Sequence, residues 1–135
     1  MKLDGYVKAG LHKFWLNDAN WIRLVIVDTA AGIGMRIVNG PTVHSFKEGN
    51  GEPEGGLSAF AIIAESNISI HTWPVEGYVT VDVFSCKDFD PEAAHELLTK
   101  MLGIKEVVRY SVDPERGGPP GLAAKPPPVV SVVKS

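Results

Sequence analysis

The sequence predicts an α+β fold, a two-layer α/β sandwich with a largely antiparallel sheet and helices on one face. Several short segments alternate apolar and polar residues with a period of two, which is typical of half-buried strands. Two other segments carry apolar residues at helical spacing behind a residue that can cap a helix. The expected order is β-α-β-β-β-β-α-β, in which consecutive strands favour hairpin pairing.

The N-terminal part is expected to hold a strand, a helix and a second strand. Residues 6–16 alternate loosely and predict the first strand. Asn17 or Asp18 can cap the helix, whose apolar residues at helical spacing are Trp21, Ile22, Leu24 and Val25. The β-branched character of residues 24–27 leaves a strand possible there. Residues 36–46 return to an extended pattern.

The central part predicts a loop followed by three strands. Residues 47–56 are rich in glycine and glutamate and offer almost nothing to bury, so they predict a solvent-exposed loop. The apolar segment 57–64 predicts a strand, and residues 67–72 and 78–84 alternate with a period of two. Gly77 separates these last two strands.

A second helix is expected after the central strands. Asp88 or Asp90 can cap it, Pro91 suits its first turn, and Gly103 can end it. Its apolar stripe consists of Ala94, Leu97, Leu98 and Met101.

The C-terminal part predicts one more strand and then a tail. Residues 107–112 predict the strand, whereas prolines and glycines dominate from residue 114 onward and predict an extended, mobile segment. We therefore expect a single domain over residues 1–113 and a tail over residues 114–135.

Composition and charge argue against several classes of function. A chain of 135 residues with net charge −3 and no basic stripe is not expected to bind nucleic acid. The four histidines and the single cysteine show no metal-ligand spacing, so no metal is expected. No apolar run approaches the length that spans a bilayer and no secretory signal opens the chain. We expect a cytoplasmic protein without a membrane partner.

The most informative stretch places three chemically capable side chains close together. Ser66 lies at the junction of two predicted strands, His71 follows five residues later, and Cys86 ends the next strand. On one regular strand Ser66 and His71 would point to opposite faces, so Ser66 must lie in a turn or bend for the two to meet. Each residue taken alone also has an ordinary structural explanation, as a turn serine, a core histidine and a small buried thiol.

Residues 58–86 resemble the S-adenosylmethionine decarboxylases of bacteria and archaea. The proenzymes of that family carry a segment like Glu-Ser-His-(apolar)-(Ser/Thr)-Ile-His-Thr-Trp-Pro-Glu, followed by a strand like Val-Asp-(Val/Leu)-Phe-(Thr/Ser)-Cys. Here the corresponding segments read ESNISIHTWPV at 65–75 and VDVFSC at 81–86. The match has no gap from Ser58 to Cys86, is thinner outside that core, and does not include the proline-rich tail.

The resemblance implies a self-processing decarboxylase. The chain would cleave itself between Glu65 and Ser66 by attack of the serine hydroxyl on the preceding carbonyl, and Ser66 would become a pyruvoyl group, with no metal and no external cofactor. His71 corresponds to the proposed base in processing, and Ser58 to a serine thought to stabilise the tetrahedral intermediate. Cys86 corresponds to the cysteine that returns a proton to the substrate carbon. The ketone would accept the electrons released with CO₂.

Three departures from the family pattern affect substrate binding more than processing. Asn67 replaces a histidine, Val75 replaces a glutamate that is displaced to Glu76, and the insertion at 47–56 enlarges a loop. Phe46 corresponds to an aromatic residue that could stack on adenine, with a core role equally open. Glu76 is the remaining candidate for the ribose hydroxyls.

Three functions remain open at this stage. The resemblance implies S-adenosylmethionine as the substrate, supplying the aminopropyl donor for spermidine synthesis. A pyruvoyl enzyme acting on ornithine or arginine is the alternative, because Glu48, Glu52 and Glu54 in the insertion would suit a cationic side chain. A processing-dead regulatory paralogue is the third.

A homodimer is expected for the processed protein. A two-layer sandwich leaves one face or one edge of its sheet uncovered. The family pairs two protomers with active sites near the interface.

Overall fold

The computed structural model describes residues 1–46, 55–112 and 130–133. Within these residues the chain forms one seven-stranded sheet, in the order β2-β3-β4-β5-β1-β6-β7, and three helices. All neighbouring strands run antiparallel. The strands are β1 (Lys2–Val7), β2 (Arg36–Ser45), β3 (Leu57–Ala64), β4 (Ser66–Trp73), β5 (Tyr78–Ser85), β6 (Ile104–Val112) and β7 (Val130–Val133). The helices are α1 (Leu11–Trp15), α2 (Ala19–Gly32) and α3 (Pro91–Leu102).

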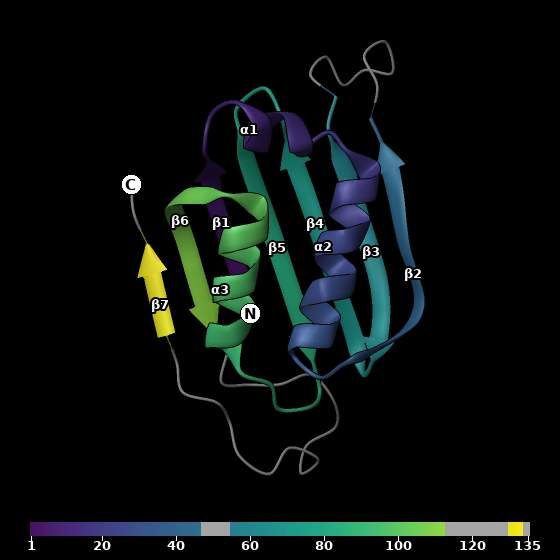
Figure 1. The fold of residues 1–135 in the computed structure, drawn as a ribbon. Coiled ribbons are helices and arrows are strands. Elements are labelled where there is room, and N and C mark those ends of the chain that lie inside the picture. The colour runs from purple at the N-terminus through teal and green to yellow at the C-terminus, as the bar shows by residue number, and fades with distance from the viewer. Residues whose placement is uncertain (47–54, 113–129, 134–135) are drawn as a thin grey trace.

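The helices lie on one face of the sheet, which confirms the predicted two-layer α+β sandwich. Figure 1 shows α2 and α3 side by side across that face, and the two helices contact each other. Alternate residues of the strands point toward them, because side chains along a strand alternate between faces. The fully buried contributors to this core include Ile63, Ile68, Ile70, Val79 and Val81 from the sheet and Ile22, Ile26 and Leu98 from the helices.

Both long helices begin and end as their sequences predict. The Asp18 carboxylate accepts hydrogen bonds from the main-chain N–H groups of Asn20 and Trp21, and Asp90 does the same for the first turn of α3. These bonds satisfy donors that a helix leaves unpaired at its N-terminus. Gly103 ends α3 in the left-handed conformation with φ of 68°. The structure therefore selects Asp18 over Asn17 and Asp90 over Asp88 as caps.

The strand predicted over residues 6–16 is wrong. Strand β1 ends at Val7, and α1 is a short helix in which Leu11 and Phe14 are 66% and 71% exposed. Gly10, at φ of 81°, breaks the extended backbone between the two elements. The last strand of the predicted domain also begins earlier than expected, at Ile104 instead of residue 107.

The segment predicted to be a mobile tail contributes one strand. Residues 130–133 form β7, which pairs with β6 from Val112↔Val130 to Arg109↔Val133 and so extends the sheet at that edge. The rest of the predicted tail lies outside the described residues, as do residues 47–54 of the predicted loop.

The face of the sheet opposite the helices carries an apolar surface, called here the open face. Five large side chains that point to it are 40% to 46% exposed, namely Tyr6, Phe60, Ile62, Trp73 and Phe84. None of the described helices covers this face. None of them is long and apolar enough to cross a membrane either.

Candidate active site

Ser66 lies at the sharp reversal between β3 and β4, where its backbone leaves regular strand geometry. Strand β3 ends at Ala64 and β4 begins at Ser66, so a single residue, Glu65, separates the two strands. Ser66 has φ of 128°, a conformation that residues with a Cβ rarely adopt. Such backbone strain is concentrated at functional sites, because the surrounding structure must stabilise it. The structure confirms the prediction that Ser66 lies in a bend.

Two neighbouring groups contact the residues on either side of the Glu65–Ser66 bond. The Asn67 side-chain amide donates a hydrogen bond to Ser66 Oγ at 3.3 Å. The Cys86 main-chain N–H donates to the Glu65 carbonyl oxygen at 3.2 Å. Cys86 lies next to Glu65 because β5 pairs with β4 in a register that places Ser85 opposite Ser66. We call Glu65, Ser66, Asn67 and Cys86 the cleavage group.

The turn that carries Cys86 is held by a buried serine. Ser85 is 5% exposed, and its Oγ accepts a hydrogen bond from the Lys87 main-chain N–H at 3.0 Å. This contact fixes the backbone on both sides of Cys86. Cys86 itself is half-buried.

Ser58 and His71 form a second site on the open face. They are directly paired residues of β3 and β4, and Ser58 Oγ lies 2.7 Å from His71 Nδ1. When Nδ1 carries the proton and donates it to Ser58, the Nε2 lone pair of a neutral imidazole remains able to accept a proton. In that tautomer the contact with Ser58 holds the His71 ring and leaves Nε2 as its proton-accepting nitrogen.

The two sites do not meet within one chain. Strand β4 pairs without interruption with β3 and β5 from Ser66 onward, so it runs straight between Ser66 and His71. Five residues at about 3.3 Å each separate Ser66 from His71 by about 16 Å. The bend at Ser66 is therefore present without bringing the two residues together. The bend exists, but it reverses the chain before β4 and leaves His71 far along that strand.

Phe46 lies at the same end of the sheet as the Ser58–His71 pair. Its ring contacts the edge of His44 with centroids 4.6 Å apart, and His44 is opposite Ser58 in the register of β2 and β3. Glu76 is exposed in the turn between β4 and β5 and lines a cavity of about 300 Å³ with Tyr6, Lys13, Lys105 and Glu106 among others. The two predicted substrate-binding residues thus both lie at the end of β4 remote from Ser66.

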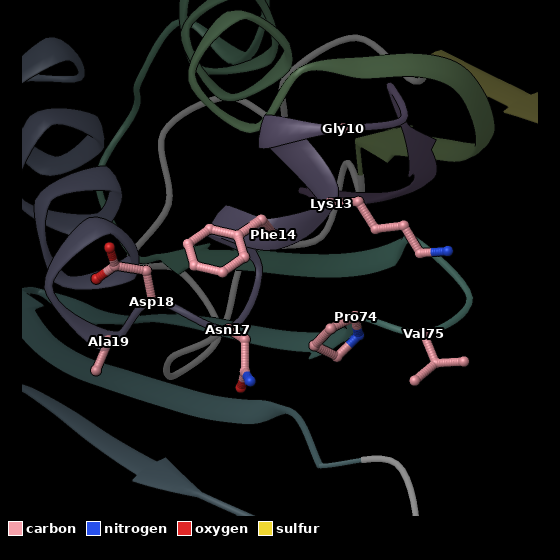
Figure 2. Close-up of a pocket in the computed structure, with 8 residues that line it drawn as sticks. All are labelled: Gly10, Lys13, Phe14, Asn17, Asp18, Ala19, Pro74 and Val75. Atoms are coloured by element: carbon pink, nitrogen blue, oxygen red, sulfur yellow. The ribbon is translucent and has the colours of Figure 1, made fainter.

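A larger cavity, of about 750 Å³, opens at this end of the sheet between α1, the start of α2 and the end of β4. Figure 2 shows Phe14 facing Pro74 across it, with Lys13 and Val75 at one end and Asp18 and Ala19 at the other. Lys13 and Phe14 were not among the predicted site residues, because residues 6–16 were expected to form a strand. The helical spacing of Leu11, Phe14 and Trp15 was the signal that could have revealed α1.

A polar network occupies the centre of the open face. The Thr80 hydroxyl donates to the carboxylate of Asp4, which is 8% exposed, and Arg109 Nη1 lies 3.6 Å from Asp4 Oδ2. Burial raises the pKa of Tyr78, and the negative charge of Asp4 raises it further. Tyr78 contacts Tyr6 and Trp73, with ring centroids 5.0 and 5.7 Å apart. Among the described residues, no cluster of His, Cys, Asp and Glu is arranged to hold a metal ion.

Known proteins share both the sequence and the fold. The family model described as S-adenosylmethionine decarboxylase matches residues 9–114. An S-adenosylmethionine decarboxylase proenzyme from Pyrobaculum neutrophilum is 42% identical over 91 residues, which are 67% of this chain and 69% of that protein. An arginine decarboxylase proenzyme from Caldivirga maquilingensis is 31% identical over 105 residues, covering 77% of this chain and 75% of the other.

The similarity extends to a solved structure. The adenosylmethionine decarboxylase from Aquifex aeolicus matches with a TM-score of 0.58 and 26% identity, over 78% of this chain and 80% of that one. Together with the strained serine beside a cysteine, these matches define a decarboxylase, a carbon–carbon lyase. The chain belongs to the S-adenosylmethionine decarboxylase family.

Proposed function

We propose that this chain cleaves itself between Glu65 and Ser66, converts Ser66 into a pyruvoyl group and then decarboxylates S-adenosylmethionine. The observation that carries the proposal is the strained backbone of Ser66, with φ of 128°, directly after a carbonyl that is held by a hydrogen bond from Cys86. Release of backbone strain favours the rearrangement of the peptide into an ester. The names of the relatives, which describe proenzymes, support a processed enzyme.

The residues around Ser66 fit a group formed from that serine. Asn67 places a side-chain donor 3.3 Å from Ser66 Oγ, and the half-buried Cys86 is tied to the Glu65 carbonyl through its main-chain N–H. When bound, a pyruvoyl group supplies a ketone that accepts the electrons released by decarboxylation. In this proposal Asn67 orients the reacting atoms, while Cys86 Sγ holds the proton that returns to the substrate carbon.

During maturation a base must remove the proton from the Ser66 α-carbon. We propose that His71 is this base. Because His71 lies about 16 Å from Ser66 along β4, it cannot act within its own chain. We therefore also propose a homodimer in which His71 of the partner subunit serves Ser66. A two-fold axis parallel to the sheet, perpendicular to β4 and level with its middle, would exchange the two ends of that strand.

The open face supports this arrangement. The Ser58–His71 pair lies on it, as do Phe60, Ile62 and Phe84. Packing two such faces together would bury these apolar side chains, and each Å² removed from water contributes about 25 cal/mol. The dimer would thereby complete two active sites and cover the exposed side of the sheet.

The substrate is the finer part of the proposal. Relatives named as S-adenosylmethionine decarboxylases support that molecule, whose product would serve as the aminopropyl donor for spermidine. The cavity beside Val75 combines Phe14, Pro74 and Val75 with the charged side chains of Lys13 and Asp18, so its lining does not favour one substrate over the other. The arginine decarboxylase from Caldivirga keeps a basic amino acid as the second candidate.

Two measurements test the function. On a denaturing gel and by mass spectrometry, the purified protein should give fragments 1–65 and 66–135, the second with a blocked N-terminus, whereas Ser66→Ala should remain one chain. A free serine at the start of the second fragment would indicate ordinary proteolysis and contradict the proposal.

Release of labelled CO₂ from S-adenosylmethionine, arginine and ornithine, measured side by side on processed protein, identifies the substrate. Turnover of a basic amino acid alone would replace the substrate but keep the mechanism.

A further inference from the structure

We propose that the main-chain N–H of Cys86 stabilises the negative charge that develops on the Glu65 carbonyl oxygen during self-cleavage. Cys86 would then act twice through different atoms, by its N–H in maturation and by its thiol in decarboxylation. This inference rests on the proposed self-cleavage and adds a group that the resemblance does not assign.

The geometry places this donor at the reacting carbonyl. The Cys86 nitrogen lies 3.2 Å from the Glu65 oxygen before any reaction. Donors aimed at the position where charge develops are most effective at about 2.7–3.1 Å. A small approach, as the carbonyl carbon becomes tetrahedral, brings the N–H into that range.

The hydroxyl that the resemblance assigned to this role lies elsewhere in the chain. Ser58 is opposite His71, five residues of β4 beyond Ser66, so it is about 16 Å away along the strand. Ser58 of the partner subunit could approach in the proposed dimer. The Cys86 N–H is the donor that the cleaving chain itself supplies, and it is in place before any dimer forms.

The turn that carries this N–H is built to hold it. Ser85 is buried, its Oγ bonds both the N–H and the carbonyl oxygen of Lys87 at 3.0 Å, and it lies opposite Ser66 in the register of β4 and β5. The Cys86 amide therefore lies between Ser85 and Lys87, whose backbones are restrained by these hydrogen bonds. A preorganised donor is effective because it does not have to reorient during the reaction.

The chemical step is balanced without any other reactant. The Ser66 oxygen forms a bond to the Glu65 carbonyl carbon, and the π electron pair moves to the carbonyl oxygen that faces the Cys86 N–H. When that pair returns, the bond from the carbon to the Ser66 nitrogen breaks. The hydroxyl proton ends on the released amine, and the product is an ester.

The test removes the N–H and keeps the thiol. In the full-length chain, the amide between Ser85 and Cys86 is replaced by an ester, which substitutes an oxygen for the Cys86 nitrogen. The protein is assembled unfolded and cleavage is timed from refolding. We expect cleavage to slow by about 10²–10³-fold, the loss typical of removing one such donor.

A matched control carries the same replacement at Val83. Its main-chain N–H donates to the Met1 carbonyl oxygen at 2.8 Å, so this ester also deletes one hydrogen bond of β5 but does not touch the cleavage group. We expect it to cleave at a rate within about twofold of wild type, because it leaves the oxyanion donor intact. Equal rates for the two esters would overturn the inference. A wild-type chain that never cleaves would instead overturn the proposed function.

A second measurement does not require the ester to fold. In the uncleaved Ser66→Ala chain, NMR should detect a scalar coupling across the hydrogen bond from the Cys86 nitrogen to the Glu65 carbonyl carbon, together with slow exchange of the Cys86 amide proton. Rapid exchange and no coupling would contradict the inference.

Discussion

At the scale of single residues, Cys86 takes part in both proposed reactions. Its main-chain N–H would act in self-cleavage, and its thiol would act in decarboxylation. Its N–H donates to the Glu65 carbonyl oxygen, directly before the serine that would become the pyruvoyl group, and its side chain is half-buried. A substitution of the side chain leaves the main-chain N–H in place. The two roles can therefore be separated by mutation.

Cys86→Ala should still cleave between Glu65 and Ser66 but should lose most decarboxylation, on the order of 10²-fold, because it removes a proton donor. Cleavage is measured on a denaturing gel, and decarboxylation by release of labelled CO₂ per mole of processed chain. Full decarboxylation by this variant would exclude the thiol from the mechanism.

At the scale of secondary-structure elements, the N-terminus of α2 distinguishes two residues that the sequence could not rank. The Asp18 carboxylate accepts two main-chain hydrogen bonds, whereas Asn17 is an exposed neighbour. We expect Asp18→Ala to lower the free energy of unfolding by about 1 kcal/mol, the usual contribution of an N-cap. Asn17→Ala is the matched control and should change stability by a few tenths of that value. Denaturant unfolding at neutral pH measures both, and equal losses would contradict the assignment.

The contact between β6 and α3 gives a second prediction at this scale. The Tyr110 hydroxyl donates to Glu92 Oε1 at 2.9 Å. Burial raises the pKa of Tyr110 above its ordinary value of 10.0, and the hydrogen bond to Glu92 raises it further. As the pH rises, the unfolded chain therefore loses this proton first. The stabilisation is complete below about pH 10 and is lost as the pH rises toward the folded-state pKa.

Tyr110→Phe should thus lower the free energy of unfolding by about 1 kcal/mol at pH 7. The gap between the variant and wild type should narrow above about pH 10, because only wild type loses the tyrosine contribution there. Urea unfolding of both proteins, at pH 7 and again above about pH 10, measures the difference in their free energies of unfolding. A gap of constant size would show that the hydroxyl does not titrate as described.

At the scale of the whole molecule, the separation of Ser66 from His71 along β4 is the reason that the proposed mechanism includes a dimer. In the proposed dimer each active site takes Ser66 from one chain and His71 from the other. Ser66→Ala and His71→Ala chains should each fail to mature alone. When the two are coexpressed, the His71→Ala chain should be cleaved and should gain a blocked N-terminus at Ser66, because its partner supplies the base. No maturation in the mixture would assign both residues to one chain.

The open face provides an independent test of the same assembly. Ile62 is 44% exposed on this face, and Leu24 is 43% exposed on α2 on the other side of the molecule. Ile62→Lys should give a folded monomer by light scattering that does not mature, because a charge in the interface would lose its hydration without a partner. Leu24→Lys should remain a maturing dimer. Dimers of equal stability in both variants would move the interface away from the open face.

Much of the fold could be predicted because its signals are local. The period-two patterns at 67–72 and 78–84 correspond to β4 and β5, and Asp90, Pro91 and Gly103 correctly bounded α3. The strand predicted over residues 6–16 was wrong because Gly10 changes the backbone direction there. The apolar residues of this segment fit the spacing of a strand and that of a helix. The motif around Ser66 indicated the bend and a nearby cysteine, but it did not indicate that His71 lies far along β4 from Ser66.

The class of chemistry could be inferred from the chain, because the segment 58–86, which includes Ser58, Ser66, His71 and Cys86, resembles the decarboxylase family. Tertiary structure alone decided which of these residues meet. Strand pairing aligns Ser58 with His71 and Ser85 with Ser66, and it inserts β1 between β5 and β6. Such pairings join residues far apart in the chain, whereas local periodicity specifies only which face of a strand is buried. For that reason the straight path of β4, which separates Ser66 from His71, became visible only in the folded sheet.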